Sequence, residues 1–190
     1  MLGLATSIAR FKSWQVFLVT GLPFVFLQFL FMPDPEVMRD IERFEALFSR
    51  MMWSALPIIG LVYVWVWSIG RVANGAASSD IRRATRFFDV CLPYAFAYIV
   101  FAIFFFPKPS NFADPPVPMT VIFPLHMLAM ICILYAFAFS AKSIRTAEQG
   151  RRVGFWSSFF PFLLIWFFPI GVWFIQPRMN SISTQVENGS

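Results

Sequence analysis

Charged side chains are scarce in this chain of 190 residues, of which Asp, Glu, Lys and Arg make up only 13%. Soluble domains carry about 25% charged residues, so a water-exposed globule of this composition would lack polar surface. Histidine occurs once, at His126, and cysteine twice, at Cys91 and Cys132. These residues have no metal-type spacing, so the sequence predicts no metal site and no cofactor. Both cysteines lie within apolar runs, where a free cysteine typically serves as a small buried hydrophobic side chain.

Catalytic signatures are missing as well. The sequence has no Ser/His/Asp set, no HExxH, no glycine-rich phosphate loop and no CxxC. Acid–base catalysis requires titratable groups that converge on a substrate, and a single histidine with few acids provides little for it. The sequence therefore predicts no catalytic residues and a protein that is not an enzyme.

Apolar residues take the place of the missing charges. Hydrophobic residues make up 58% of the chain, and they gather in blocks near residues 14–32, 52–70, 88–106, 119–141 and 155–176. A helix needs about 20 apolar residues to cross about 30 Å of hydrocarbon. The sequence predicts one all-α domain over 1–190, a polytopic transmembrane helix bundle of about five spans, with the first block as an uncleaved anchor. Tryptophans near the block ends, Trp65 among them, are typical of membrane interfaces.

The basic residues lie mostly at alternate ends of these blocks. Ten of the fifteen Lys and Arg residues precede the first block or lie between the second and third or the fourth and fifth. By the positive-inside rule, we expect a bacterial inner-membrane protein with a cytoplasmic N-terminus and, after five crossings, a periplasmic C-terminus. The net charge of +5 then reflects topology, and we expect lipid rather than nucleic acid as a partner. Candidate contacts to anionic headgroups are Arg82, Arg83, Arg86, Arg151 and Arg152.

The segment between the first two blocks has a helical pattern of its own. Asp34-Pro35 is typical of a helix start, and Ile41, Phe44 and Phe48 then recur at helical spacing among charged residues. This predicts an amphipathic outer helix, which either lies on the membrane surface or extends the second span into water. At the other end of the sequence, we expect residues 178–190 to form a polar, disordered tail.

His126 is the main candidate for an intramembrane polar site. Small residues follow it at helical spacing, which places it on a helix-contact face, with Gln28 or Tyr98 as candidate partners. An ionisable group at this depth indicates either a structural hydrogen bond or a transport site. Asp89, the fourth candidate for the polar site, lies at the cytoplasmic end of the third block. There it either forms an ion pair with Arg86, which we expect, or serves as an acid at the mouth of a conduction path.

Every apolar block contains proline, which frees a backbone carbonyl and bends a helix. Pro169 and Gly171 leave two forms open for the fifth block: a kinked full crossing, which we expect, or a re-entrant hairpin, which indicates a pore or site. The first two blocks and the next two share a similar pattern of residues, which leaves open whether the chain contains an internal duplication. The candidate hinges are Pro57, Pro93, Pro124, Pro169 and Gly171.

Residues 159–180 read FFPFLLIWFFPIGVWFIQPRMN. This segment resembles the C-terminus of a family of small uncharacterised multi-pass membrane proteins, mainly of Bacteroidota-type bacteria, whose pattern is approximately FFLIWFFPIGIWFIQPRIN. The resemblance covers about the last third of the chain. It implies an integral membrane protein and transfers no activity or site.

These observations predict a non-enzymatic membrane subunit or accessory protein that acts through helix–helix interaction, with a membrane-protein partner or as a homo-oligomer. The alternative is a small oligomeric transporter or channel whose polar site surrounds His126.

Overall fold

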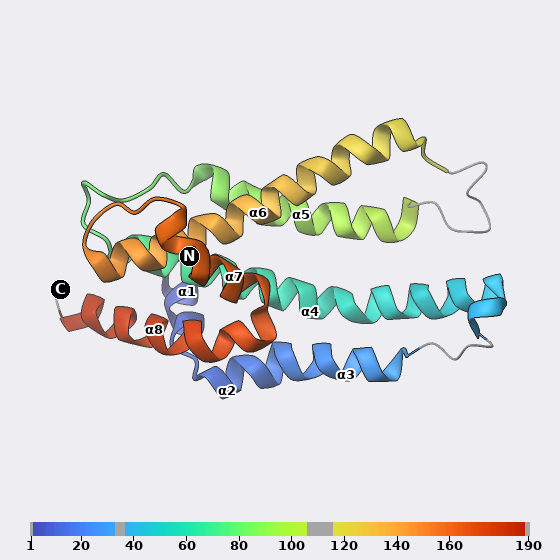
Figure 1. The fold of residues 1–190 in the computed structure, drawn as a ribbon, viewed down its shortest axis with the longest axis horizontal. Coiled ribbons are helices and arrows are strands. Elements are labelled where there is room, and N and C mark those ends of the chain that lie inside the picture. Colours follow the sequence, from blue (N-terminus) through green and yellow to red (C-terminus); the bar gives the residue numbers. More distant parts are fainter. Residues whose placement is uncertain (1, 33–36, 106–115, 189–190) are drawn as a thin grey trace.

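The computed structural model describes residues 2–32, 37–105 and 116–188, which form a bundle of helices (Figure 1). Four segments are long and apolar enough to cross a membrane: Ser13–Leu30, Ile41–Ala76, Arg86–Phe105 and Met119–Gln149. The prediction of an all-α, multi-pass membrane protein is confirmed, with four such segments among the described residues rather than five. The fifth apolar block forms a different structure.

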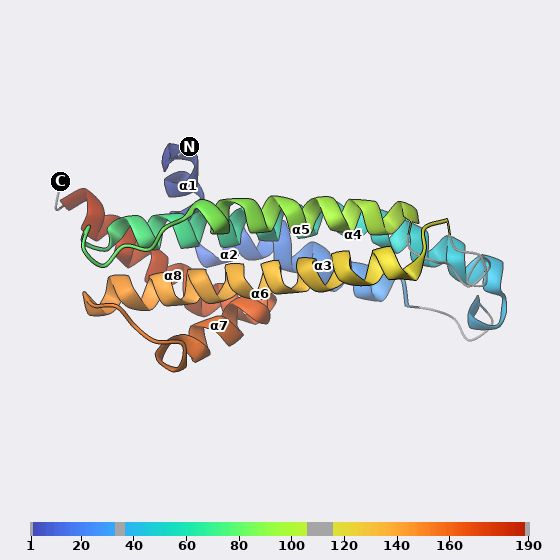
Figure 2. The ribbon, with the colours of Figure 1, turned by 90° about the horizontal axis from the view of Figure 1, so that it is seen from above.

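The first span comprises α2 (Ser13–Val16), a π-helical turn (Phe17–Gly21) and α3 (Leu22–Leu30). The Thr20 hydroxyl donates to the carbonyl of Val16 (2.6 Å) within the π-helical turn. Proline at residue 23 has no N–H to continue the ladder, and the wider turn lies just before it. In front of this span, α1 (Leu2–Ala9) lies across the bundle rather than along it (Figure 2).

The predicted amphipathic outer helix is the start of α4 (Ile41–Ala76), a single helix of 36 residues. At 1.5 Å per residue, it is about 54 Å long, well beyond the about 30 Å of the hydrocarbon. Of the two predicted forms, the extended second span is the one observed. Asp40 caps the helix by accepting a hydrogen bond from the amide of Arg43 (3.1 Å), whereas the predicted cap at Asp34 lies outside the described residues. A short 3-10 turn (Val37–Arg39) precedes the cap.

The next two spans, α5 (Arg86–Phe105) and α6 (Met119–Gln149), pack with α4 into the centre of the bundle. Gly70 of α4 allows this close packing, because a Cβ there would come within 2.6 Å of both the Phe88 ring and the Ser140 hydroxyl, and these side chains would have to move. The Ser140 hydroxyl donates to the carbonyl of Val66 (3.1 Å). At its end, α6 stops at Gly150, which is left-handed (φ 62°) and serves as a helix cap.

The predicted full crossing of the fifth block is wrong, and the re-entrant alternative is the form observed. A 3-10 turn (Trp156–Ser158) leads into α7 (Phe159–Trp166), which runs into the bundle. The chain then turns at Phe167, and α8 (Phe168–Asn188) returns along the bundle (Figure 1). Pro169 cannot donate to the carbonyl four residues back, and the residue before a proline avoids helical geometry. These effects explain why the helix breaks here.

Gly171 allows α7 and α8 to touch at the turn. A Cβ at this position would lie 1.6 Å from the carbonyl oxygen of Leu164, so no other residue fits this backbone. The other candidate hinges, Pro57, Pro93 and Pro124, lie inside continuous helices and are exposed on the surface of the bundle. Only the hinge at Pro169 and Gly171 lies at a break in the helix.

The prediction of a disordered tail over 178–190 is wrong for residues 178–188, which continue α8, and residues 189–190 lie outside the described part of the chain. Ile175, Met179 and Ile182 recur at helical spacing and are buried in the core. Burial of this stripe stabilises the helix even though most residues around it are polar. The last turn of α8 consequently lies at the same end of the bundle as the connections over 77–85 and 150–155 (Figure 1). This is the end where the basic residues gather, and it is opposite to the predicted position of the C-terminus.

Candidate functional site

The polar site predicted around His126 contains one of its candidate partners. The Tyr98 hydroxyl of α5 lies 3.2 Å from Nδ1 of His126 on α6, and the two rings are edge to face. Beside them, Tyr94 donates to the carbonyl of Leu125 (3.2 Å). The predicted small-residue face is confirmed, because Ala129, Cys132, Ala136 and Ser140 are all buried. His126 itself is half-buried.

The other two candidate residues lie elsewhere. Gln28 is exposed on α3, whereas His126 is on α6 and Tyr98 is on α5. Asp89 lies in the first turn of α5, nine residues before Tyr98. The structure therefore reduces the predicted four-residue site to a His–Tyr pair between two adjacent helices.

Asp89 belongs to a separate network at the basic end of the bundle. Arg71 donates from Nη1 to the Asp89 carboxylate (3.1 Å) and to the Thr85 hydroxyl (2.7 Å). The indole of Trp67 donates to the other carboxylate oxygen (3.1 Å). The predicted pairing of Asp89 with Arg86 is wrong, because Arg71 and Trp67 on α4 present their donors to this carboxylate. The network joins α4 to α5.

Several of the predicted headgroup arginines bind protein carbonyls instead. Arg82 donates from Nε to Ala77 and from Nη2 to Gly75 (both 2.7 Å), which satisfies carbonyls that the end of a helix leaves open. Arg83 donates to Val153 (3.0 Å), and Arg152 donates to Asp80 (3.3 Å). Arg86 and Arg151 remain candidates for headgroup contact and are exposed.

Further polar contacts are made in the 77–85 connection. A hydrogen bond from Ser78 lowers the pKa of the Asp80 carboxyl, with a smaller contribution from Arg152. Asn74 pairs with the backbone of Arg83 through both its amide nitrogen and its oxygen (2.9 Å each). The side chains of Asn74 and Arg83 thus fix the course of this connection.

The most connected polar residue in the described core is Gln176, which the sequence analysis did not identify. Its Nε2 donates to the carbonyls of Ala9 (2.8 Å) and Phe11 (2.7 Å), while Oε1 accepts from the indole of Trp65 (2.9 Å). Gln176 is fully buried. Its hydrogen bonds to Trp65 and Ala9 are buried as well, whereas the one to Phe11 is half-buried. One side chain joins the α1–α2 connection, α4 and α8. A single polar residue beside a proline near the end of an apolar block was its only signal in the sequence.

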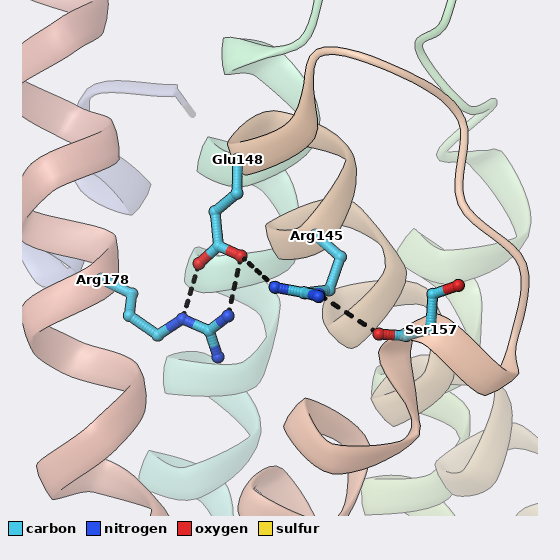
Figure 3. Close-up of polar contacts among 4 residues, drawn as sticks. All are labelled: Arg145, Glu148, Ser157 and Arg178. Carbon is cyan, nitrogen blue, oxygen red and sulfur yellow. Dashed lines mark hydrogen bonds and ion pairs between the residues drawn. The ribbon is translucent and has the colours of Figure 1, made fainter.

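Two residues further along the chain, Arg178 makes a bidentate ion pair. Its Nε and Nη2 donate to the two carboxylate oxygens of Glu148 on α6 (2.6 and 2.7 Å). Arg145 donates to the same carboxylate (3.1 Å) and to the carbonyl of Ser157 (3.2 Å). Figure 3 shows Glu148 held between the two guanidinium groups. Gln176 and Arg178, both in the IQPR stretch of the C-terminal motif, therefore connect α8 to the rest of the bundle.

The tip of the α7–α8 hairpin lies beside the middle of the first span. The rings of Phe168 and Phe24 are in edge-to-face contact, with centroids 5.6 Å apart, and Trp166 meets Phe137 of α6 at 6.0 Å. A groove of about 490 Å³ lies against this tip. Its lining comprises Phe24, Ile58, Ile59, Val62, Tyr63, Ile99, Ile133, Phe137 and the tip residues 166–170.

Within the described ranges, no group of three or more His, Cys, Asp or Glu side chains is arranged to hold a metal ion. The apolar spans and their packing define the class of protein: a multi-pass membrane protein whose described residues include four candidate spans and a helical hairpin. Comparison of the chain with protein-family models, curated proteins and solved structures finds no match.

Proposed function

We propose that this chain is a non-enzymatic component of a bacterial cytoplasmic membrane, a subunit or accessory protein that binds another membrane protein through the outer part of α4. The basic end of the bundle faces the cytoplasm in this proposal, since cytoplasmic loops carry the excess of Lys and Arg. The family resemblance of residues 159–180 stays a prediction that is compatible with this function.

The observation that carries the proposal is the extension of α4 beyond its neighbours. The first turns of α4 project past the ends of α3, α5 and α6 in both views (Figures 1 and 2). Ile41 and Phe48 are at least half exposed there, and the Phe44 and Phe48 rings stack with centroids 6.3 Å apart. Exposed apolar residues on a helix with charged neighbours are typical of a protein-binding surface.

The polar groups at membrane depth support the same function. His126 contacts Tyr98, Ser140 contacts the carbonyl of Val66, and Gln176 has three partners within the chain. These side chains act as connections between helices, which is a common use of polar groups in membrane bundles.

Site-directed photo-crosslinking in intact cells tests this proposal. A photoreactive amino acid at Phe48 should give a crosslink to one membrane protein, because this position lies on the exposed apolar face. The same amino acid at Glu42, which is exposed on a different face of the same helix, should not. A crosslink to a second copy of the chain identifies the partner as a homo-oligomer, whereas equal labelling from both positions overturns the proposal.

The hairpin favours a second candidate, a small oligomeric transporter or channel. Broken helices whose ends meet within the bilayer form the substrate sites of many transporters, and the hairpin tip lies beside the middle of the first span. In liposomes with a pH-sensitive dye, this candidate predicts proton or ion flux that His126→Ala abolishes at a normal protein level. Unchanged flux in that variant eliminates the role of His126.

A further inference from the structure

We propose that the groove at the hairpin tip binds one acyl chain of a bilayer phospholipid, with the tip residues Phe167 and Phe168 as the stop for its methyl end. The site goes beyond the proposed function and holds for either candidate. It is distinct from the α4 extension and from the His126–Tyr98 pair.

The chemistry of the lining selects a hydrocarbon. Among the lining side chains only Tyr63 and Trp166 carry a polar atom, and the others are aliphatic, proline or phenylalanine. Water needs two to four polar partners to occupy a cavity, so it gains little in this groove. An empty groove would forfeit dispersion contacts along its whole wall. An acyl chain restores these contacts without requiring any hydrogen bond.

The groove is continuous with the surface that faces the lipid. Phe24, Phe167 and Ile170 belong to the lining and are also exposed, by 37%, 58% and 63%. In a membrane the medium at this depth is hydrocarbon. An acyl chain can therefore enter sideways from the bilayer without passing a charged residue of the lining.

The volume of the groove suits a single flexible chain. The groove measures about 490 Å³, which falls within the range of about 300–1,000 Å³ for pockets that hold small molecules.

The direction of the hairpin indicates the leaflet. From the tip, α8 runs toward Gln176, which contacts Trp65 of α4. The groove lies on the other side of the tip, against Ile58, Ile59 and Val62, which precede Trp65 along α4. The phospholipid consequently belongs to the leaflet at the α3–α4 end of the bundle, opposite to the basic end.

Photolabelling with a lipid probe tests the site. The purified full-length chain is reconstituted into phosphatidylcholine vesicles that contain a trace of phosphatidylcholine with a diazirine in the middle of one acyl chain. After illumination, mass spectrometry should find label concentrated in the peptides that contain Ile58–Tyr63 and residues 167–170, and excess unlabelled lipid should compete for it.

Two matched tryptophan substitutions make the test specific. Ile170→Trp places an indole at the exposed edge of the groove beside the tip, while Ile131→Trp adds the same bulk at a similarly exposed position on α6 that is not part of the lining. The indole of Ile170→Trp occupies part of the space that the acyl chain would fill, so this variant should remove most of the groove labelling. Ile131→Trp should leave it unchanged. Ile59→Phe, which narrows the groove from α4, provides a second variant if Ile170→Trp reduces the folded yield.

Native mass spectrometry in a mild detergent gives an independent readout. The unchanged chain and Ile131→Trp should each retain one phospholipid, and Ile170→Trp should lose it. Label spread evenly over all lipid-facing peptides, or equal labelling in the two tryptophan variants, overturns the proposal. A stable dimer with protein–protein crosslinks at the groove overturns it too, because a second copy is then the occupant.

Discussion

At the residue scale, Gln176 illustrates how much of the architecture depends on one polar side chain. Its three hydrogen bonds use both amide donors and the acceptor, and they pair the Trp65 indole and the carbonyls of Ala9 and Phe11. Hydrogen bonds between membrane helices contribute about 0.6 to 2 kcal/mol each. A buried group that loses its partner costs about 1–3 kcal/mol.

Gln176→Leu should therefore destabilise the protein by about 2–4 kcal/mol, because the indole and the two carbonyls lose their partner together. The measurement is thermal or denaturant unfolding in detergent. Gln28→Leu is the matched control, since Gln28 is exposed, and its effect should stay within about 0.5 kcal/mol. Equal stability of the two variants would show that the Gln176 hydrogen bonds contribute little.

Gly171 is the residue on which the close contact of the hairpin depends. Gly171→Ala places a Cβ 1.6 Å from the carbonyl oxygen of Leu164, so α7 and α8 must separate, at a cost of about 3 kcal/mol or more. Lower folded yield and a lower unfolding midpoint should result. Gly75→Ala is the control, because a Cβ at that helical position meets nothing within 4 Å, and it should leave stability unchanged or raise it by up to about 1 kcal/mol.

At the element scale, the ion pairs of Glu148 determine how firmly the end of α8 is held. The Arg178 and Glu148 side chains are only about a quarter exposed (27% and 24%), and bidentate geometry strengthens the pair. Partial solvent screening still limits its contribution to about 1 kcal/mol.

A double-mutant cycle with Glu148→Ala and Arg178→Ala should give a coupling free energy of about 1 kcal/mol that falls with added salt. Either single variant should also speed hydrogen exchange in the last turns of α8, because they lose their tie to α6. Glu42→Ala, an exposed acid on α4, should leave exchange in α8 unchanged. Additive single effects would show that the pair has no energetic role.

The elements show what hydropathy can and cannot predict. The spans near 52–70, 88–106 and 119–141 were predictable, because lipid requires long apolar helices and their ends carry basic residues. The fate of the fifth block was not predictable, since Pro169 and Gly171 suit a kink and a hairpin equally. The choice depends on close contact with Leu164, which only the tertiary structure contains.

The predicted polar contacts failed for a related reason. The partner of Asp89 was sought one turn away on its own helix, whereas the observed donors are on α4. Trp65 was interpreted as an interfacial tryptophan from its position in the sequence, yet it is buried against Gln176. Spacing along one helix predicts neighbours on that helix. Contacts between helices depend on their rotation and depth, which spacing does not specify.

At the scale of the whole molecule, the hairpin changes the number of membrane crossings from an odd number to an even one. Four of the described segments are long and apolar enough to cross a membrane, and α7 and α8 enter and leave at the same end of the bundle (Figure 1). The N-terminal end of the first span and the last turn of α8 then lie on one side. The basic residues gathered at that end favour the cytoplasm for both.

Reporter fusions should reveal this arrangement directly in a bacterial host. A fluorescent protein that matures only in the cytoplasm, fused after Ser190, should be bright, and alkaline phosphatase at the same position should be inactive. A fusion truncated after Phe105 is the control: three crossings precede it, so the two reporters should exchange their behaviour.

Active phosphatase after Ser190 would mean that the fifth block crosses the bilayer completely. In that case the groove at the hairpin tip would have no end stop. The ion pair between Arg178 and Glu148 could not form either, because Arg178 would lie on the opposite side of the membrane from the end of α6.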